Sequence, residues 1–324
     1  MIRNDLCYAL AAGRPMLIDP LKAKAFLANA NAILSNPDLA LLLQKGANHK
    51  AKGLRADDDD TETAPGQPMA GAESMAKDCT PYVRDGIGII PVRGVIGKGL
   101  SYLESMLGCA DIDVISKQLD TWKERDDIFE ILFDIDSGGG STTGLEELAK
   151  KIRNYNKVTI GFTESDCGSA AFWIGSQCKR FVCTPSASVG ACGVYITLTD
   201  ESEKWAKEGK SQVVIKSGKY KAAGVEGTKL TDAQYEDLQR EVDELHSRFI
   251  RDVRSVRQFA EVEDLQGQSF YGDFAAARGL ATGVVDSLEV LIDDIKSTRL
   301  FAVKNTLPTY YQSNNIINTN PYAG

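Results

Sequence analysis

The sequence predicts an α/β fold organised around a mostly parallel β-sheet. Apolar runs typical of buried strands, such as residues 128–137 and 158–164, alternate with amphipathic helical patterns at residues 113–125 and 143–155. Alternation of apolar strands with helices favours a parallel sheet that helices cover. The chain of 324 residues is long enough to enclose a substantial core.

Residues 81–296 contain these elements and are predicted to form the main domain. A long helix is expected to begin near Thr231 or Asp232, because apolar residues recur at three- and four-residue steps from Tyr235 to Val253. The remaining expected elements are strands at residues 86–96, 180–184, 194–199 and 212–218, and helices at residues 169–178 and 200–209.

Three other segments differ from the main domain in composition. Residues 1–48 have helical patterning and predict a small helical N-terminal segment. Residues 49–80 are poor in apolar residues and rich in Ala, Gly, Pro and charge, which indicates a flexible linker. Its four adjacent aspartates, residues 57–60, are expected to be solvated rather than to bind a metal. Residues 297–324 are Asn-rich and aperiodic, so an extended or disordered tail is expected.

The overall composition excludes several classes of protein. The net charge is −8 and no basic stripe stands out, which argues against nucleic-acid binding. No stretch approaches the ~18 apolar residues of a membrane span, and charges and prolines interrupt any signal-peptide core, so a cytosolic protein is expected. The seven cysteines include no CxxC pair, which favours buried free thiols over zinc ligands. Neither a metal nor a cofactor is expected.

The first stretch with chemical potential is the glycine-rich turn "DIDSGGGSTTG", residues 134–144. It follows a buried strand, and ligands of open α/β sheets bind at the carboxyl edge where such strands end. Consecutive glycines leave backbone N–H groups uncovered, and these can hold a phosphate or the oxyanion of a tetrahedral intermediate. Glycine-rich turns are common, so this signal is weak alone.

The second stretch, "DCGSAAFWIG" (residues 166–175), places Ser169 at the start of a helix. The hydroxyl then lies at the positive end of the helix dipole beside the N–H of Ala170. By frequency, a serine in this position is a helix cap. The alternative is a nucleophile, and the apolar residues that follow favour it because they bury and desolvate the helix.

The third stretch, "IKSGKYKAAGVEG" (residues 215–227), has three lysines within six positions. Such lysines are usually solvated surface charges. One of them is also a candidate general base, because the two histidines, His49 and His246, are far from Ser169 in the sequence. A base lysine must be neutral, and burial or neighbouring cations favour its neutral form. Activity would then rise from neutral toward alkaline pH.

In this order, the three stretches resemble the signal-peptide-peptidase-A family of serine peptidases. Within that family the sequence is most similar to the head-maturation proteases of tailed bacteriophages. The resemblance covers residues 82–296 and implies a ClpP/crotonase-like fold, a repeated β-β-α superhelix. The motifs that carry it are "GIGIIPVRGVI", "DSGGG", "CGSAAFWIGSQCKRFVCTPSASVGACGV", "SGKYK" and "YGDFAAARGLATGVVD".

The resemblance implies a catalytic role for four residues. Ser169 matches the nucleophile and Lys221, the last lysine of "SGKYK", matches the general base. The backbone N–H groups of Gly139 and Ala170 match the oxyanion donors. Neutral Lys221 would take the proton of Ser169, and the acyl-enzyme would then be hydrolysed.

Two positions depart from the family pattern. Gly138 stands where the family usually has proline, and Ala191 stands where a serine often helps to position the lysine. Ser188 is a candidate to replace that hydroxyl, and Gly140 is an auxiliary candidate in the glycine turn. These departures leave open a catalytically inactive capsid-assembly or scaffold module. A crotonase-like acyl-CoA enzyme, in which the paired amides hold an enolate and Ser169 is dispensable, is the other alternative.

The resemblance also implies the biological setting. The expected substrates are capsid, scaffold or portal proteins and the protease itself, with the linker and the tail as self-cleavage sites. The expected location is the host cytoplasm, within an assembling procapsid. A homo-oligomer is expected, in which neighbouring subunits share active sites. Neither nucleic acid nor a membrane is an expected partner.

Overall fold

The computed structural model describes residues 16–18, 79–101, 104–105 and 108–306. The chain divides into two compact units, Met1–Val284 and Val285–Gly324. The first contains the sheet and the candidate site. None of the helices in the described part of the chain is long and apolar enough to cross a lipid bilayer.

The sheet of the first unit is built on β5 (Glu130–Ser141). The apolar start of β5 lies in the core, where Ile131, Leu132 and Phe133 are fully buried. Most strand pairs are parallel, so the predicted α/β class with a mostly parallel sheet is confirmed. The other strands are β1 (Met16–Ile18), β2 (Tyr82–Arg84), β3 (Ile87–Gly97), β4 (Ala110–Asp111), β6 (Val158–Thr163), β7 (Asp166–Gly168), β8 (Arg180–Cys183), β9 (Ser188–Gly190), β10 (Ser269–Tyr271) and β11 (Gly283–Val284).

Two edges of β5 receive different partners. β3 pairs in parallel along one edge, from Ile87 opposite Glu130 to Ile96 opposite Gly140. β6 and β7 pair in parallel with other parts of β5, and the antiparallel β1 pairs with its last residues. Gly138, Gly139 and Gly140 of the expected glycine turn therefore belong to the end of β5 itself, and β5 pairs with β7, the strand that leads to Ser169.

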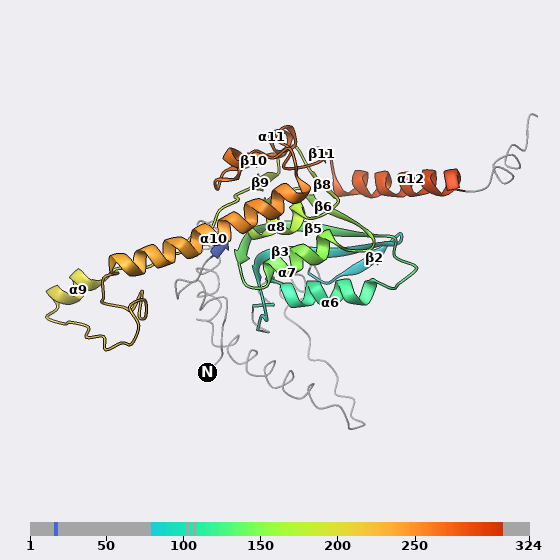
Figure 1. The fold of residues 1–324 in the computed structure, drawn as a ribbon. Coiled ribbons are helices and arrows are strands. Elements are labelled where there is room, and N and C mark those ends of the chain that lie inside the picture. The colour runs from blue at the N-terminus through green and yellow to red at the C-terminus, as the bar shows by residue number, and fades with distance from the viewer. Residues whose placement is uncertain (1–15, 19–78, 102–103, 106–107, 307–324) are drawn as a thin grey trace, which may run out of the picture. The chain divides into compact units, whose positions relative to one another are not determined.

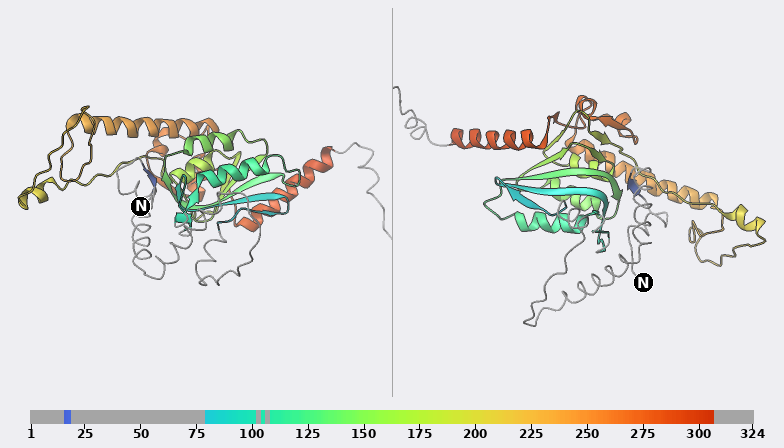
Figure 2. Two further views of the ribbon diagram at one scale, coloured as in Figure 1. Left: turned by 90° about the horizontal axis from the view of Figure 1, so that it is seen from below. Right: turned by 180° about the vertical axis from the view of Figure 1, so that it is seen from behind.

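Three helices pack along the sheet, as the alternating pattern predicts: α6 (Ile112–Trp122), α7 (Leu145–Arg153) and α8 (Ala170–Ser176). Figure 1 shows them in front of the strands, and the view from behind in Figure 2 shows the strands in front of them. All seven residues of α8 are buried, which makes it the central helix of the core.

The long helix α10 (Asp232–Val256) begins where the sequence predicts. Thr231 caps it, and Gln234 completes a capping box with the backbone of Thr231. Near its C-terminal end α10 packs on α8, where Phe249 stacks on Trp173 with ring centroids 4.5 Å apart. The indole N–H of Trp173 also donates to a carboxylate oxygen of Asp252 at 3.2 Å.

The N-terminal part of α10 extends away from the sheet, with α9 (Ser202–Lys207) and the connecting residues 208–231 at its far end (Figure 1). The expected strands at residues 194–199 and 212–218 are wrong. Val213 and Ile215 are 79% and 98% exposed. β-Branched residues favour strands, but within the described part of the chain no sheet edge pairs with residues 212–218.

After α10 the chain contains the 3₁₀ helix η1 (Val262–Leu265), α11 (Gly272–Ala277) and, in the second unit, α12 (Leu288–Thr306). α12 crosses the expected boundary at residue 296, so the expectation of an extended tail is wrong for residues 297–306. The helical segment expected at residues 1–48 is likewise wrong at β1, which lies between Pro15 and Pro20. The rest of that segment, almost all of the linker and residues 307–324 lie outside the described residues.

Candidate active site

Ser169 has a backbone conformation that residues other than glycine rarely adopt. It joins β7 to α8 with a φ of 53° and a ψ of −116°, and its side chain makes no capping hydrogen bond. A helix cap has an extended backbone instead, and its side chain accepts an amide hydrogen of the first turn. The cap interpretation is therefore wrong. Strained residues of this kind store about 1–3 kcal/mol and concentrate at functional sites.

The end of β9 and the loop after it hold Ser169 in this conformation. The N–H of Ser169 donates to the carbonyl oxygen of Gly190 at 2.7 Å. Its hydroxyl lies 3.5 Å from the carbonyl oxygen of Gly193, which is the outer limit of a hydrogen bond. Ala191, between these two glycines, also has a positive φ of 51°. Ser169 is only 2% exposed, so its hydroxyl is both desolvated and weakly bound.

The glycine turn lies beside Ser169. β5 and β7 are parallel with Ser137 opposite Cys167, and two more residues along each strand bring the chain to Gly139 and Ser169. A Cβ atom on Gly168 would lie 3.4 Å from the carbonyl oxygen of Gly138, so the two backbones are in close contact. The first two predicted stretches therefore meet at one place in the fold.

The two predicted oxyanion donors differ in their present hydrogen bonds. The N–H of Gly139 donates to the hydroxyl oxygen of Ser137 at 3.1 Å, and that hydroxyl donates to the carbonyl oxygen of Gly94 at 2.5 Å. The first hydrogen bond of α8 runs from the N–H of Trp173 to the carbonyl of Ser169 at 2.9 Å. The N–H of Ala170 thus has no acceptor within the helix, whereas that of Gly139 must turn away from Ser137 to bind an oxyanion.

The two auxiliary candidates have different surroundings. Gly140 needs to be glycine, because a Cβ atom there would lie 1.9 Å from the carbonyl oxygen of Ile96. Ser188 begins β9 opposite Asp166, while Gly190 is the residue opposite Gly168. A strand rises about 3.3 Å per residue, so Ser188 lies about 7 Å along β9 from Gly190, the residue that faces Gly168 beside the serine turn.

Lys221 lies at the other end of α10 from Ser169. The side-chain amide of Gln234, in the first turn of α10, donates to the carbonyl oxygen of Lys221 at 2.9 Å. His246, twelve residues further along the helix, contacts the loop that holds Ser169. Those twelve residues span about 18 Å, beyond the reach of a lysine side chain. Lys221 is also exposed. The structure therefore brings Ser169 and Gly139 together but leaves Lys221 of the same chain apart.

The neighbouring lysines organise the loop around Lys221. The ammonium group of Lys216 donates to the carbonyl oxygens of Lys219 and Lys221 at 3.2 and 3.1 Å. The ammonium group of Lys219 lies 4.5 Å from the ring centre of Tyr220. Interaction with Tyr220 raises the pKa of Lys219, opposite to the effect expected from a crowded cluster of cations. All three lysines are exposed to solvent.

His246 is a residue of the site that the sequence did not single out. Its Nε2 lies 3.0 Å from the carbonyl oxygen of Cys192 and 2.7 Å from that of Leu265. Because both partners are acceptors, Nε2 carries the hydrogen and cannot take a proton from Ser169. Cys192 directly precedes Gly193, so His246 supports the loop that contacts the serine hydroxyl. Its position one turn before the core residue Phe249 was the only signal in the sequence.

The cysteines around the site are buried thiols. Cys167, Cys178, Cys183 and Cys192 are buried, and burial raises the pKa of the last three. Among the described residues, no group of three or more His, Cys, Asp or Glu side chains is arranged to hold a metal ion. Cys7 and the four aspartates at residues 57–60 lie outside the described residues.

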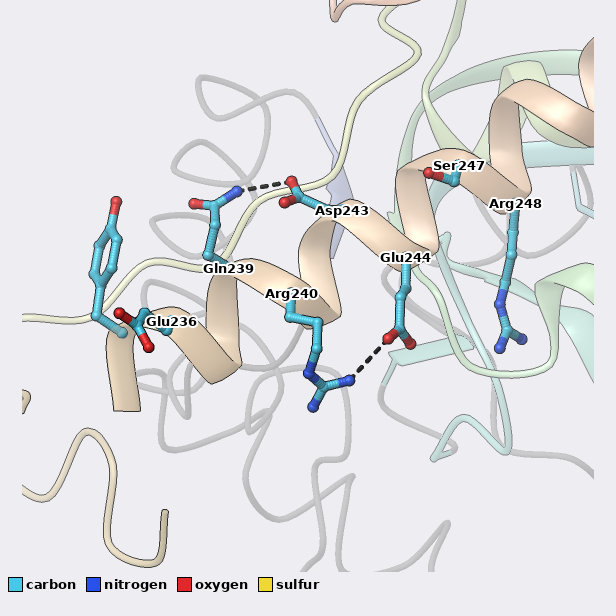
Figure 3. A pocket seen from close by; sticks show the side chains of 8 residues that line it. Glu236, Gln239, Arg240, Asp243, Glu244, Ser247 and Arg248 are labelled. Atoms are coloured by element: carbon cyan, nitrogen blue, oxygen red, sulfur yellow. Dashed lines mark hydrogen bonds and ion pairs between the residues drawn. The ribbon is translucent and has the colours of Figure 1, made fainter. Parts of the chain in front are cut away.

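A hollow of about 580 Å³ lies along the exposed part of α10, away from Ser169. Figure 3 shows its lining side chains projecting from this one helix, with Gln239 bonded to Asp243 and Arg240 to Glu244. The side chains that line it are Tyr235, Glu236, Gln239, Arg240, Asp243, Glu244, Ser247 and Arg248. Several of their charges are already paired at the protein surface, so the hollow does not replace the site at Ser169.

Comparison with known sequences identifies protease relatives. A family model described as Peptidase family S49 matches residues 152–299, which include Ser169 and Lys221 but not Gly139. "Head-tail preconnector protein GP5" of Enterobacteria phage P21 is 24% identical over 90% of this chain and 57% of its own length. "Capsid assembly protease C" of Escherichia phage lambda is 24% identical over 93% of this chain and 69% of its own length. The chain thus spans little more than half of the phage P21 protein.

Comparison with solved structures gives more distant similarity. An enoyl-CoA hydratase from Shewanella pealeana aligns over 72% of this chain and 78% of its own, with a TM-score of 0.43 and 10% identity. A membrane-bound stomatin-specific protease, solved as a point mutant in complex with a substrate peptide, aligns over 61% of this chain and 77% of its own, with a TM-score of 0.36 and 16% identity.

Proposed function

Since the chain belongs to peptidase family S49, we propose that it is a serine endopeptidase in which Ser169 forms the acyl-enzyme. The strained backbone of Ser169 carries this proposal. At its φ of 53° the buried hydroxyl makes no bond to the amides of its own helix, and the glycine turn lies beside it. Attack on a peptide carbonyl would break the peptide bond, release the amine and leave an ester on Ser169, which water then hydrolyses.

Lys221 is proposed as the general base, acting on Ser169 of a neighbouring chain. The distance along α10 supports this arrangement, because Lys221 cannot reach the serine of its own chain. The lysine loop is exposed and presents Ile215 and Tyr220 to solvent. Burial of this loop against a second chain would desolvate the ammonium group, which favours the neutral form that can accept a proton. Lys221 would then protonate the leaving amine.

The N–H groups of Ala170 and Gly139 are proposed to bind the oxyanion. Ala170 begins α8, and its N–H has no acceptor within the helix. Gly139 has a φ of 111°, open to glycine alone, so its peptide can turn from the Ser137 hydroxyl when a substrate arrives. Loss of one such donor typically costs about 10²–10³ in rate.

The proposed substrates are the capsid, scaffold or portal proteins of a tailed phage, together with the protease itself. This follows from the relatives, which are described as a capsid assembly protease and a head-tail preconnector protein. The proposed place of action is the assembling procapsid in the host cytoplasm. The departures at Gly138 and Ala191 favour the second candidate, an inactive assembly module.

Fluorophosphonate labelling and a mixing experiment test the dyad. Ser169→Ala and Lys221→Ala are each expected to lower labelling and the cleavage of co-expressed capsid proteins by about 10³-fold or more. Lys219→Ala, an exposed neighbour in the same loop, is the matched control and is expected to keep full activity. New termini in the capsid proteins are mapped by mass spectrometry.

If the dyad forms between chains, a mixture of Ser169→Ala and Lys221→Ala chains regains activity, because some sites receive both intact residues. No recovery on mixing would place the base elsewhere. Full activity of Lys221→Ala would refute the dyad, and an unlabelled wild-type protein would favour the inactive module.

A further inference from the structure

Residues Met16–Ile18 form a strand on the glycine turn of the candidate site. They pair antiparallel with the end of β5, with Met16 opposite Ser141, Leu17 opposite Gly140 and Ile18 opposite Gly139. Figure 1 shows this short strand in dark blue beside the sheet. The partner residues are those of the predicted oxyanion turn.

The geometry of β5 places this strand next to Ser169. A strand has two hydrogen-bonding edges, and β3 occupies one of them from Glu130 to Gly140. β6, β7 and β1 must therefore share the other edge, in that order along β5. β7 pairs at Ser137 and leads two residues later to Ser169, so β1 occupies the next stretch of edge beyond the serine turn.

The direction of β1 is that of the acyl side of a peptide substrate. Because β1 is antiparallel to β5, the chain runs from Ser141 toward Gly139, and its C-terminal residue Ile18 lies nearest to the serine turn. Gly138, Gly139 and Gly140 carry no side chains, so a peptide backbone can approach this edge closely. Such an edge binds extended peptides mainly through main-chain hydrogen bonds.

We propose that β1 is an internal competitor of substrate, which occupies the edge at Gly139–Ser141 until an extended peptide displaces it. The proposal rests on the proposed function, because it assigns this edge to the acyl side of the peptide that Ser169 attacks. A tethered segment competes at a high effective concentration. The chain therefore restrains its own site, and assembly partners that remove β1 would activate it.

The test measures peptide binding in a Ser169→Ala background, where no turnover occurs. Facing residues of an antiparallel pair alternate between hydrogen-bonded and non-hydrogen-bonded pairs. The double variant Leu17→Pro/Ile18→Pro replaces one residue of each kind with proline, which has no N–H group to donate, so it removes the β1 donor whichever of the two residues is hydrogen-bonded. The matched control, Met69→Pro/Ala70→Pro, introduces two prolines into the predicted linker. The probe is a fluorescein-labelled peptide with the sequence of residues 13–19, GRPMLID, followed by fluorescence anisotropy.

The strand variant is expected to bind the probe at least tenfold more tightly than the Ser169→Ala parent and the linker control. Amide exchange at residues 139–141 is expected to be at least tenfold faster in the strand variant without probe, with residues 130–134 unchanged as proof of folding. Equal affinities, or no binding to the folded strand variant, would overturn the proposal. Fluorophosphonate labelling of proteins with Ser169 intact tests the nucleophile separately, because that small probe does not need the strand edge.

Discussion

Replacement of Ser169 by glycine should stabilise the protein relative to replacement by alanine. A residue other than glycine at a φ of 53° and a ψ of −116° costs about 1–3 kcal/mol, and glycine removes this strain. Glycine also makes the unfolded chain more flexible, which offsets about 0.4–1 kcal/mol of the gain. The hydroxyl adds little to stability, because its one contact is 3.5 Å long. The free energy of unfolding of Ser169→Gly should therefore exceed that of Ser169→Ala by about 1 kcal/mol.

Thermal unfolding at one protein concentration measures this difference. For a domain of this size, 1 kcal/mol corresponds to about 2–4 °C in melting temperature. The same pair of substitutions at Ser247, an exposed position in α10, is the matched control. There glycine should be less stable than alanine by about 1 kcal/mol, because the helix backbone is unstrained. If glycine were also the less stable residue at position 169, the strain argument would be refuted.

Two further predictions concern the core. Phe249→Ala removes a fully buried ring stacked on Trp173 and should lower the free energy of unfolding by about 3–5 kcal/mol in a denaturant titration. Phe259 is 85% exposed, so Phe259→Ala should change that free energy by less than about 0.5 kcal/mol. Similar losses in the two variants would contradict this packing. Burial raises the pKa of the Cys178 thiol from an ordinary 9.0 to about 12 and that of Cys183 to about 11. Their stabilising contribution should be complete below pH 9 and lost as the pH rises through the folded values, and mass spectrometry after iodoacetamide treatment of the native protein near pH 8 should show neither thiol modified before denaturant is added.

The sequence predicted the elements that local pattern determines. β5, α8 and α10 follow from apolar runs and from the cap at Thr231, and each has its partners packed against it in the core. The meeting of the glycine turn with Ser169 also followed from the order of strands, because both end at the carboxyl edge of a parallel sheet.

The elements that the sequence did not predict depend on distant partners. The β-branched residues Val213, Val214 and Ile215 favour a strand, but no edge in the described part of the chain pairs with them. β1 forms because an edge more than 120 residues later in the chain is open to it, and no local pattern of Met16–Ile18 reveals that edge. The positive φ of Ser169 likewise depends on distant carbonyl groups, those of Gly190 at the end of β9 and Gly193 in the following loop, so residue frequency alone favoured a helix cap.

The length of α10 has a kinetic consequence for the proposed dyad. Its 25 residues span about 37 Å. The lysine loop lies at one end, and His246, which contacts the loop beside Ser169, lies toward the other. If each working site needs two chains, the number of sites in dilute solution follows the square of the chain concentration, and a twofold dilution removes about three quarters of them. Under the proposed function, newly made chains would then be nearly inactive, and proteolysis would begin where many copies are gathered in a small volume, as in the proposed procapsid.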